Sequence, residues 1–300
     1  MIDQVIAAAL TLSVPLVLAA LGGAVHRQAG VVNIGLEGQM LVGALLGALV
    51  SGATRSWELG VLAGAGAGGA VGWLMSVTIT RLRANEIIAG LGFNTVVLGV
   101  IGYWLRASQD VSGTLQVEGL ERLPTWVVPG VADVPVLGAL VSGKSPLFWL
   151  AVVLVGACAW TLDGTRWGLR VRAVGASPVA SASLGLRTRG LQDSAGTVAG
   201  VLAGLGGASL SLGAVGLFNE NMTAGRGFVA MAAFYFGRAR PLPTALACLL
   251  FGTFDAIQAR LQIGGGYSAS LIQTLPYVAV VVVLALTGVR SSRRRARAAA

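Results

Sequence analysis

One stretch of the chain carries a nucleotide-binding pattern. Residues 138–145, GALVSGKS, match G-x-x-x-x-G-K-[ST] and contain Lys144, the only lysine in the chain. Such a loop wraps phosphates with backbone N–H groups, between a strand and a soluble helix. Here Pro146 and a long apolar run follow, so Ser145 is predicted to cap a membrane helix that Pro146 opens. We therefore expect no nucleotide site on this chain.

Several polar residues inside apolar segments could instead contact a substrate. Asn33, Glu37 and Gln39 lie within GVVNIGLEGQM, and Asn94 stands alone in a later segment. An ionisable group at membrane depth costs at least ~2.5 kcal/mol, so it usually faces a protein interior or a pathway. In a continuous helix, Asn33 and Glu37 would share one face. Polar contacts between helices are the alternative to lining a substrate route.

A second polar group is expected at an outer membrane boundary, where Asn219, Glu220 and Asn221 are consecutive. Amides donate and accept hydrogen bonds, and carboxylates accept them, which suits sugar hydroxyls and the edges of nucleobases. The same groups equally satisfy the ends of helices. These three residues therefore join the first four as candidates for a substrate pathway.

Side chains for catalysis or metal binding are scarce. His26 is the only histidine and stands beside Arg27, so no histidine-based triad or metal cluster can be assembled. Cys158 and Cys248 lie in apolar runs without metal-type spacing. We expect no enzymatic activity, no metal and no bound cofactor for this chain alone.

A short capped helix is predicted within the basic segment 164–192. Ser177 can cap it, Pro178 can open it, and Gly185 can end it in the left-handed conformation. Its small side chains suit a groove on another protein, although a well-formed turn would look the same. The small residues are Ala180, Ser181, Ala182 and Ser183.

The composition identifies the elements that must hold these residues. Of 300 residues, 55% are hydrophobic and 11% are charged, against ~25% charged in a soluble domain. The mean hydropathy is +0.79. A crossing needs roughly 20 apolar residues, so this is an all-α integral membrane protein with about nine spans. The spans are expected near 4–24, 30–51, 60–80, 86–106, 146–163, 193–216, 227–236, 242–258 and 271–289.

Arginines decide how these spans are oriented. The segment 227–236 is short for a crossing, but counting it places fifteen basic residues on one side and six on the other. The positive-inside rule puts the larger group, including segment 164–192 and the tail 290–300, in the cytoplasm. The loop 107–145 is then extracytoplasmic. We interpret the arginine-rich tail as an anchor to anionic lipid, not as a nucleic-acid site.

Glycines predict close helix packing. The run 64–69 spells G-x-G-x-x-G, but it lies inside a predicted span, where a dinucleotide loop cannot form. Small residues at every fourth position make a smooth ridge for a neighbouring helix. Two such ridges are present: Gly64, Gly68 and Gly72, and Gly196, Gly200 and Gly204.

Three segments in this order resemble one family. GVVNIGLEGQMLVGA, RAVGASPVASASLGL and NMTAGRGFVAMAAFYFG with PLPTALACLLFG are similar to membrane permeases of bacterial ABC importers for simple sugars and nucleosides. The wider group to which those permeases belong includes ribose and branched-chain amino-acid permeases. The resemblance implies one permease domain over 1–300 in the bacterial cell membrane. It implies a second, different permease subunit, a cytoplasmic ATPase that binds ATP and magnesium, and an external substrate-binding lipoprotein.

The resemblance also implies a role for the short helix. Residues Ser177 to Leu184 correspond to the coupling helix that docks on the ATPase, preceded by Gly175 and Ala176. Related permeases commonly read Gly-Glu-Asn-Pro where this chain reads Gly-Ala-Ser-Pro, so an acidic contact is absent here.

The resulting hypothesis is the permease subunit of an ATP-driven importer, with nucleosides as the expected cargo. A simple-sugar permease is the first alternative. An ion-coupled secondary transporter would use intramembrane carboxylates such as Glu37 and Asp255. A scaffolding membrane subunit is a third.

Overall fold

The computed structural model describes residues 2–110, 113–126, 140, 142–213 and 216–263. Helices dominate this part of the chain. In order they are α1 (Ile2–Gln28), α2 (Leu36–Thr54), α3 (Trp57–Thr80), α4 (Glu86–Gln109), α6 (Pro146–Gly164), α7 (Arg166–Ala176), α8 (Pro178–Ser183), α9 (Thr188–Ser211), α10 (Arg226–Phe236) and α11 (Pro241–Ile263). Two short strands, β1 (Thr114–Leu115) and β2 (Phe218–Asn219), pair antiparallel.

The sequence places the helix boundaries through local caps. The side chain of Ser56 accepts a hydrogen bond from the backbone nitrogen of Leu59 at the start of α3. Asn85 accepts from two backbone nitrogens at the start of α4. Within the described residues, seven helices are long and apolar enough to cross a membrane, and α10 is a shorter apolar helix. The predicted all-α membrane bundle is confirmed, and the predicted span 271–289 lies outside the described residues.

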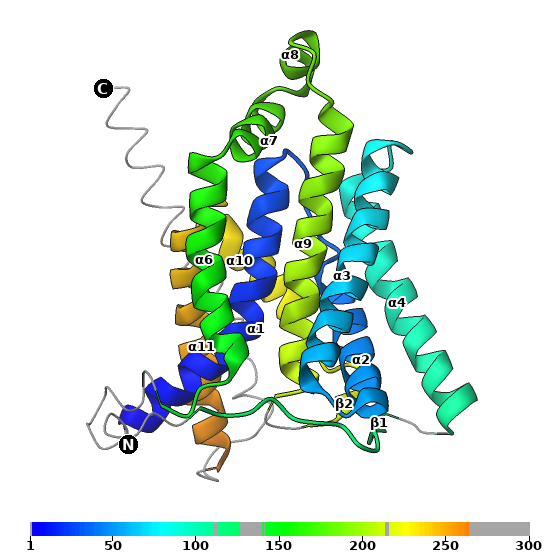
Figure 1. Cartoon of the computed structure of the whole chain (residues 1–300), viewed down its shortest axis with the longest axis vertical. Coiled ribbons are helices and arrows are strands. Elements are labelled where there is room, and N and C mark those ends of the chain that lie inside the picture. The colour runs from blue at the N-terminus through cyan, green and yellow to red at the C-terminus, as the bar shows by residue number, and fades with distance from the viewer. Residues whose placement is uncertain (1, 111–112, 127–139, 141, 214–215, 264–300) are drawn as a thin grey trace.

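The bundle has two distinct ends (Figure 1). The β1–β2 pair and the α2–α3 turn mark one, called here the sheet end. Helices α7 and α8 mark the other, called here the α8 end. Helices α1, α3 and α6 run toward the α8 end, and α2, α4 and α9 run back.

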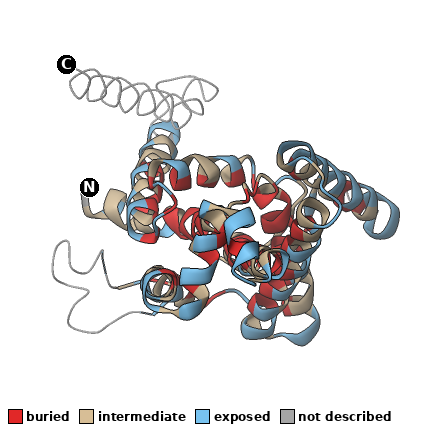
Figure 2. Ribbon diagram, turned by 90° about the horizontal axis from the view of Figure 1, so that it is seen from above, coloured by how far each residue is buried: buried red, intermediate tan, exposed pale blue. Residues whose placement is uncertain are grey.

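The centre of the bundle is formed by α1, α2, α3 and α9, and Figure 2 shows the buried residues gathered there. Of the 18-residue apolar stretch of α9, 67% is buried inside the protein, whereas the corresponding share for α4 is 17%. Helices α4, α6 and α11 therefore form the outside of the bundle and offer their apolar faces to lipid or another subunit.

The two glycine ridges pack against each other. A Cβ added to Gly68 would lie 2.6 Å from the Cα of Gly204, and one added to Gly72 would lie 2.7 Å from the Cα of Gly200. Real Cβ atoms do not approach this closely, so only glycine allows these backbones to touch. The predicted close packing is confirmed, and α9 is identified as the partner of α3.

Several predicted boundaries need correction. The span 30–51 is a helix only from Leu36, because residues 31–35 are not helical. The span 193–216 forms a helix over Thr188–Ser211. The segment 164–192 contains a second helix, α7, besides the short one that was predicted.

The lysine of the P-loop-like stretch is buried in the described part of loop 107–145. Lys144 is 2% exposed and donates to the carbonyl oxygen of Ala7 at 2.9 Å. Its ammonium also lies 5.5 Å from the ring centroid of Phe148, and burial lowers the pKa of Lys144 from its usual value. Pro146 opens α6 as predicted, although the Ser145 side chain makes no capping bond. Lys144 therefore ties this loop to α1.

Candidate functional site

A break between α1 and α2 organises the first group of candidate residues. Gly30 adopts a φ of +88°, and the chain leaves the helical conformation until Leu36. Met75, five residues before the end of α3, lies against Gly35. The α2 helix therefore begins more than one turn inside the bundle, not at its surface.

Side chains of α4 satisfy the unwound backbone. Glu86 accepts a hydrogen bond from the nitrogen of Val32 at 2.5 Å. Asn94 donates to the carbonyl oxygen of Ile34 at 3.0 Å and accepts from the nitrogen of Gly38 at 2.9 Å. Non-helical backbone at membrane depth needs such partners, because water is absent there. Asn94 thus caps α2 from a neighbouring helix.

Asn33 and Gln39 pair with each other. Both are fully buried, and their amides exchange hydrogen bonds of 3.1 and 3.3 Å. The nitrogen of Gln39 also lies 3.6 Å from the sulfur of Met75. The two amides therefore line no open surface in this conformation. They hold the unwound segment against α2.

Glu37 joins α2 to the start of α10. Its two carboxylate oxygens accept hydrogen bonds from the backbone nitrogens of Gly225 at 2.8 Å and Gly227 at 2.6 Å. Gly225 has a φ of +84°, and a Cβ on Gly227 would lie 2.6 Å from the Cα of Glu37. A carboxylate at a helix N-terminus is stabilised by the free N–H groups and the helix dipole.

The segment 227–236, predicted as a crossing, is only a half-helix. Helix α10 has 11 residues and spans about 16 Å, while the hydrocarbon core is about 30 Å thick. The chain reaches its start from β2 at the sheet end, and α10 then runs to the α8 end. The stretch from β2 to the end of α10 therefore crosses as a loop followed by a half-helix.

The starts of α2 and α10 thus meet inside the bundle. Both helices are discontinuous, and both present their N-terminal N–H groups to the same region, where Glu37 and Asn94 occupy them. Side-chain acceptors from neighbouring helices therefore satisfy the N–H groups of both helix starts, so this part of the bundle interior is polar.

The second candidate group lies apart from the first. Asn219 is in β2, where its side chain donates to Thr114 at 3.0 Å and accepts from the nitrogen of Asn221 at 3.1 Å. Glu220 lies 3.4 Å from Arg106 of α4. Twelve residues of α4 separate Arg106 from Asn94, about 18 Å along the axis at 1.5 Å per residue. The seven candidates therefore form two clusters, one inside the bundle and one at the sheet end.

The short helix α8 projects from its end of the bundle (Figure 1). Ser177 accepts a bond from the nitrogen of Ala180 at 3.3 Å, Pro178 opens the helix, and Gly185 follows with a φ of +79°. The predicted caps are confirmed. Ser181 is buried at 4% exposure, so it faces the protein, whereas Ala180 and Ala182 are exposed.

Two apolar residues of this projection were not among the predicted contacts. Val179 is 79% exposed and Leu184 is 83% exposed. Large apolar residues within an otherwise polar, basic segment could have been recognised from the sequence as candidate contacts. Gly175, by contrast, packs inward, because a Cβ there would lie 2.9 Å from the nitrogen of Gly30. The end of α7 therefore rests on the α1–α2 break.

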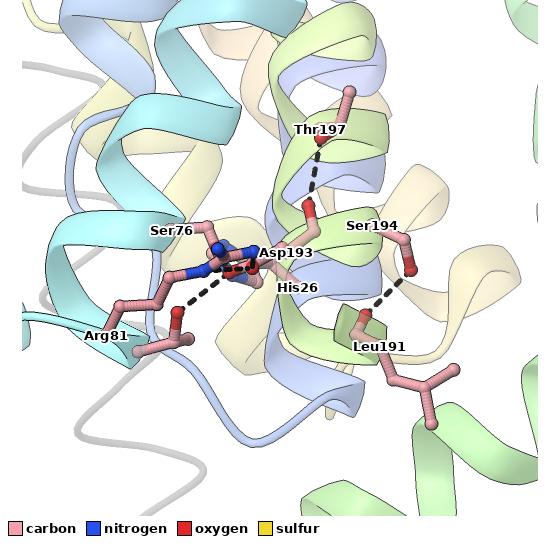
Figure 3. A network of polar contacts seen from close by, with 8 residues as sticks. His26, Ser76, Arg81, Leu191, Asp193, Ser194 and Thr197 are labelled. Carbon is pink, nitrogen blue, oxygen red and sulfur yellow. Dashed lines mark hydrogen bonds and ion pairs between the residues drawn. The ribbon is translucent and has the colours of Figure 1, made fainter. Parts of the chain in front are cut away.

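A buried polar network links α1, α3 and α9 (Figure 3). Asp193, at 4% exposure, accepts from Arg81 at 3.1 and 2.8 Å, from Thr80 at 2.7 Å and from Ser76 at 3.3 Å. His26, fully buried, lies 3.5 Å from the Ser76 hydroxyl. Asp193 is not among the residues predicted from the sequence, although an acidic residue in an apolar span requires a partner.

The geometry of this network is not that of a catalytic triad. In a triad the carboxylate orients the imidazole, and the imidazole activates the serine. Here the Asp193 carboxylate bonds Ser76 and Arg81, and the Nδ1 atom of His26 has no hydrogen-bond partner among the described residues. The network instead ties the first part of α9, the helix that follows α8 in the chain, to the end of α3.

The chain is similar in sequence to several ABC transporter permeases. The chain is 32% identical over 296 residues to the nucleoside ABC transporter permease protein NupC of Lactococcus lactis subsp. cremoris, covering 94% of this chain and 91% of that one. It is 30% identical to the guanosine ABC transporter permease protein NupQ of Bacillus subtilis, covering 95% and 91%. It is 29% identical to the putative glucose ABC transporter permease protein TsgC13 of Haloferax volcanii, covering 93% and 90%.

No solved structure shows a significant match to the chain. The family model described as branched-chain amino acid transport system / permease component matches residues 5–287, nearly the whole length. The chain therefore belongs to the permease family of the branched-chain amino acid transport system, and it is a multi-pass membrane protein.

Proposed function

We propose that this chain is the permease subunit of an ATP-driven ABC importer for nucleosides. The observation that carries the proposal is the meeting of two discontinuous helices, α2 and α10, through Glu37 inside the bundle. Discontinuous helices that meet at depth form the substrate sites of transporters that alternate between two open states, and the ATP-driven class rests on the relatives named as ABC transporter permeases. The nucleoside class rests on the relatives named for nucleosides and guanosine, and the glucose relative supports a sugar as the second candidate.

The α8 end is assigned to the cytoplasm. The ends of α1, α3 and α10, the helix α7 and the start of α9 bring ten arginines to this end. The positive-inside rule favours this orientation. The loop 107–145 and the β1–β2 pair are then extracytoplasmic, and a substrate-binding lipoprotein would deliver cargo there. The basic tail 290–300 is assigned to the cytoplasm by the same rule, and it lies outside the described residues.

The ATPase would dock on α8. ATP and magnesium would be held by that partner, and Val179 and Leu184 would enter its groove as apolar anchors. The caps at Ser177 and Gly185 hold α8 as a rigid helix, so a displacement of α8 by the ATPase is transmitted to α7 and α9. The second permease subunit would cover an outer apolar face of the bundle.

Two contacts would carry the motion inward. Asp193 ties α9 to Arg81 at the end of α3, and Gly175 rests on the α1–α2 break. A displacement of α8 thereby reaches the start of α2, where Glu37 holds α10. Substrate would pass where the two helix starts separate. In this account Asn33, Gln39 and Asn94 are positioning residues of the break, while Asn219, Glu220 and Asn221 contact cargo at the entrance.

The test is uptake by the reconstituted importer. The chain is expressed with the permease, ATPase and binding-protein partners, placed in vesicles, and supplied with labelled guanosine, uridine or glucose. We expect ATP-dependent nucleoside uptake that persists when ion gradients are collapsed. Uptake that stops with the gradients while ATP is clamped would instead identify an ion-coupled transporter.

Docking is tested with a matched pair of substitutions. Leu184→Asp places a charge on the exposed tip of α8, and we expect it to release the ATPase during purification. Leu82→Asp changes a leucine of 75% exposure in the α3–α4 turn at the same end, and it should retain the ATPase. Equal retention by both variants would show that α8 is not the docking element.

A further inference from the structure

An arginine-lined cavity lies at the α8 end, beside α7. It has a volume of about 440 Å³ and is bounded by the end of α1, by α7, and by the turn between α10 and α11. Arg27, Arg172 and Arg238 line it, one from each of these three segments. Tyr235 contributes an aromatic wall. No part of the proposed nucleoside route uses these side chains.

Positive charge in this cavity is poorly compensated. Arg172 pairs with Asp163 at 3.1 Å, and the Asp163 side chain is 74% exposed. Arg27 and Arg238 are exposed, as Arg240 is, and within the described residues their guanidinium groups make neither an ion pair nor a hydrogen bond. The Nε atom of Arg172 is buried and donates to no acceptor in the same part of the chain. A buried donor without an acceptor is uncommon in folded proteins.

The backbone holds Arg238 at this place. Arg238 and Ala239 have consecutive positive φ values of 52° and 54°, which non-glycine residues rarely adopt. The turn is fixed on both sides, since Ala239 donates to the carbonyl oxygen of Phe234 at 2.8 Å and accepts from the Gln28 amide at 2.9 Å. Strained backbone that its surroundings hold in place is concentrated at functional sites.

We propose that this cavity binds a phosphate group. Guanidinium groups bind phosphate oxygens through paired, charge-assisted hydrogen bonds, and three of them from different directions suit a tetrahedral anion. The volume accommodates a phosphate with the group that carries it. The phosphate belongs either to a phospholipid headgroup at the membrane boundary or to a soluble phosphate compound. An uncharged nucleoside does not match this chemistry.

A bound phosphate would also link two moving parts. Gly175 and Ala176 line the same cavity and directly precede Ser177, the cap of α8. On the opposite wall, Arg238 follows α10, the half-helix that Glu37 holds. An anion shared by Arg172 and Arg238 therefore fixes the spacing between α7, which leads into α8, and α10.

Binding is measured on the purified full-length chain and requires no transport activity. In the first arm, inorganic phosphate and pyrophosphate are titrated calorimetrically against the chain in phosphatidylcholine nanodiscs. In the second arm, phosphatidylglycerol is added to the nanodiscs, and the thermal midpoint is followed. Saturable binding in the first arm identifies a soluble ligand, and a raised midpoint in the second alone identifies a headgroup.

Matched variants decide whether the cavity is responsible. Arg27→Gln and Arg238→Gln should each weaken the responding arm by roughly tenfold, because each removes charge-assisted bonds. Arg240→Gln, an exposed arginine that does not line the cavity, should bind like the parent chain. Elution as a single species checks that every variant folds.

Three results would overturn the proposal: no response in either arm, an equal loss in the Arg240→Gln control, or cavity variants that bind as the parent does. If the cavity variants bind phosphate normally but lose the ATPase during purification, the arginines bind a carboxylate of the ATPase instead.

Discussion

The carboxylate of Glu37, in the first turn of α2, accepts a hydrogen bond from the backbone nitrogen of Gly227, in the first turn of α10. The nitrogen and the carboxylate oxygen are 2.6 Å apart. A second bond from Gly225 completes the contact. One side chain therefore joins two helix starts that are separated by 190 residues in the sequence.

Glu37→Gln should weaken this junction. The amide keeps one acceptor oxygen but replaces the other with a donor that faces a backbone N–H, so one charge-assisted bond is lost at a cost of about 2 kcal/mol. We expect a lower thermal midpoint for the purified chain and reduced uptake by the assembled importer. The control is Glu118→Gln at an exposed position in loop 107–145, which should change neither. A parent-like midpoint for Glu37→Gln would show that the junction contributes little.

The glycine ridges predict that a valine substitution has different effects at two positions of α3 that are only two residues apart. Gly68→Val should prevent normal folding, because a Cβ there would lie 2.6 Å from the Cα of Gly204. Gly66→Val changes the helix propensity by the same amount, but a Cβ at this position would have no atom within 4 Å. Size-exclusion profiles and thermal midpoints of both variants make the comparison. If the two behave alike, the tight α3–α9 contact does not exist in the membrane.

Asp193→Asn should loosen α9 from α3. The substitution removes the ion pair with Arg81 and weakens the bonds from Ser76 and Thr80, and a buried charge-assisted contact of this type is worth about 2 kcal/mol. Arg81 is 54% exposed, so its charge remains solvated. We expect a lower midpoint and ATP hydrolysis that no longer drives uptake.

The control for that substitution is Asp163→Asn. Asp163 forms an ion pair of similar length with Arg172, but its side chain is 74% exposed, and such pairs contribute between 0 and about 1 kcal/mol. Its midpoint should stay near that of the parent chain. Equal shifts in the two variants would mean that burial at Asp193 is unimportant.

Gly185→Val should uncouple transport from ATP hydrolysis. The φ of +79° is unfavourable for a β-branched residue by about 1–2 kcal/mol, and no atom lies within 4 Å, so the effect is one of backbone strain alone. Gly185→Asn tolerates this conformation and should keep uptake and hydrolysis coupled. The ratio of nucleoside transported to ATP hydrolysed is the measurement. A parent-like ratio for the valine variant would remove the support for a docking role of α8.

The sequence by itself determined the class of this protein and much of its local structure. Composition and apolar run length identify a helical membrane bundle, because a bilayer admits few other solutions. Ser177, Pro178 and Gly185 predict α8 and its ends, because caps depend on neighbouring residues only. The spacing of Gly64, Gly68 and Gly72 predicts a close helix contact, because a ridge follows directly from the helical period.

Only the tertiary structure decided which elements meet. The break before Leu36 is hidden from hydropathy, since an unwound apolar segment has the same composition as a helical one, and its backbone is satisfied by Glu86 and Asn94 of another helix. Likewise, nothing near Glu37 in the sequence identifies Gly227 as its partner. Contacts between distant segments depend on how all the helices pack together, and spacing along one helix does not contain that information.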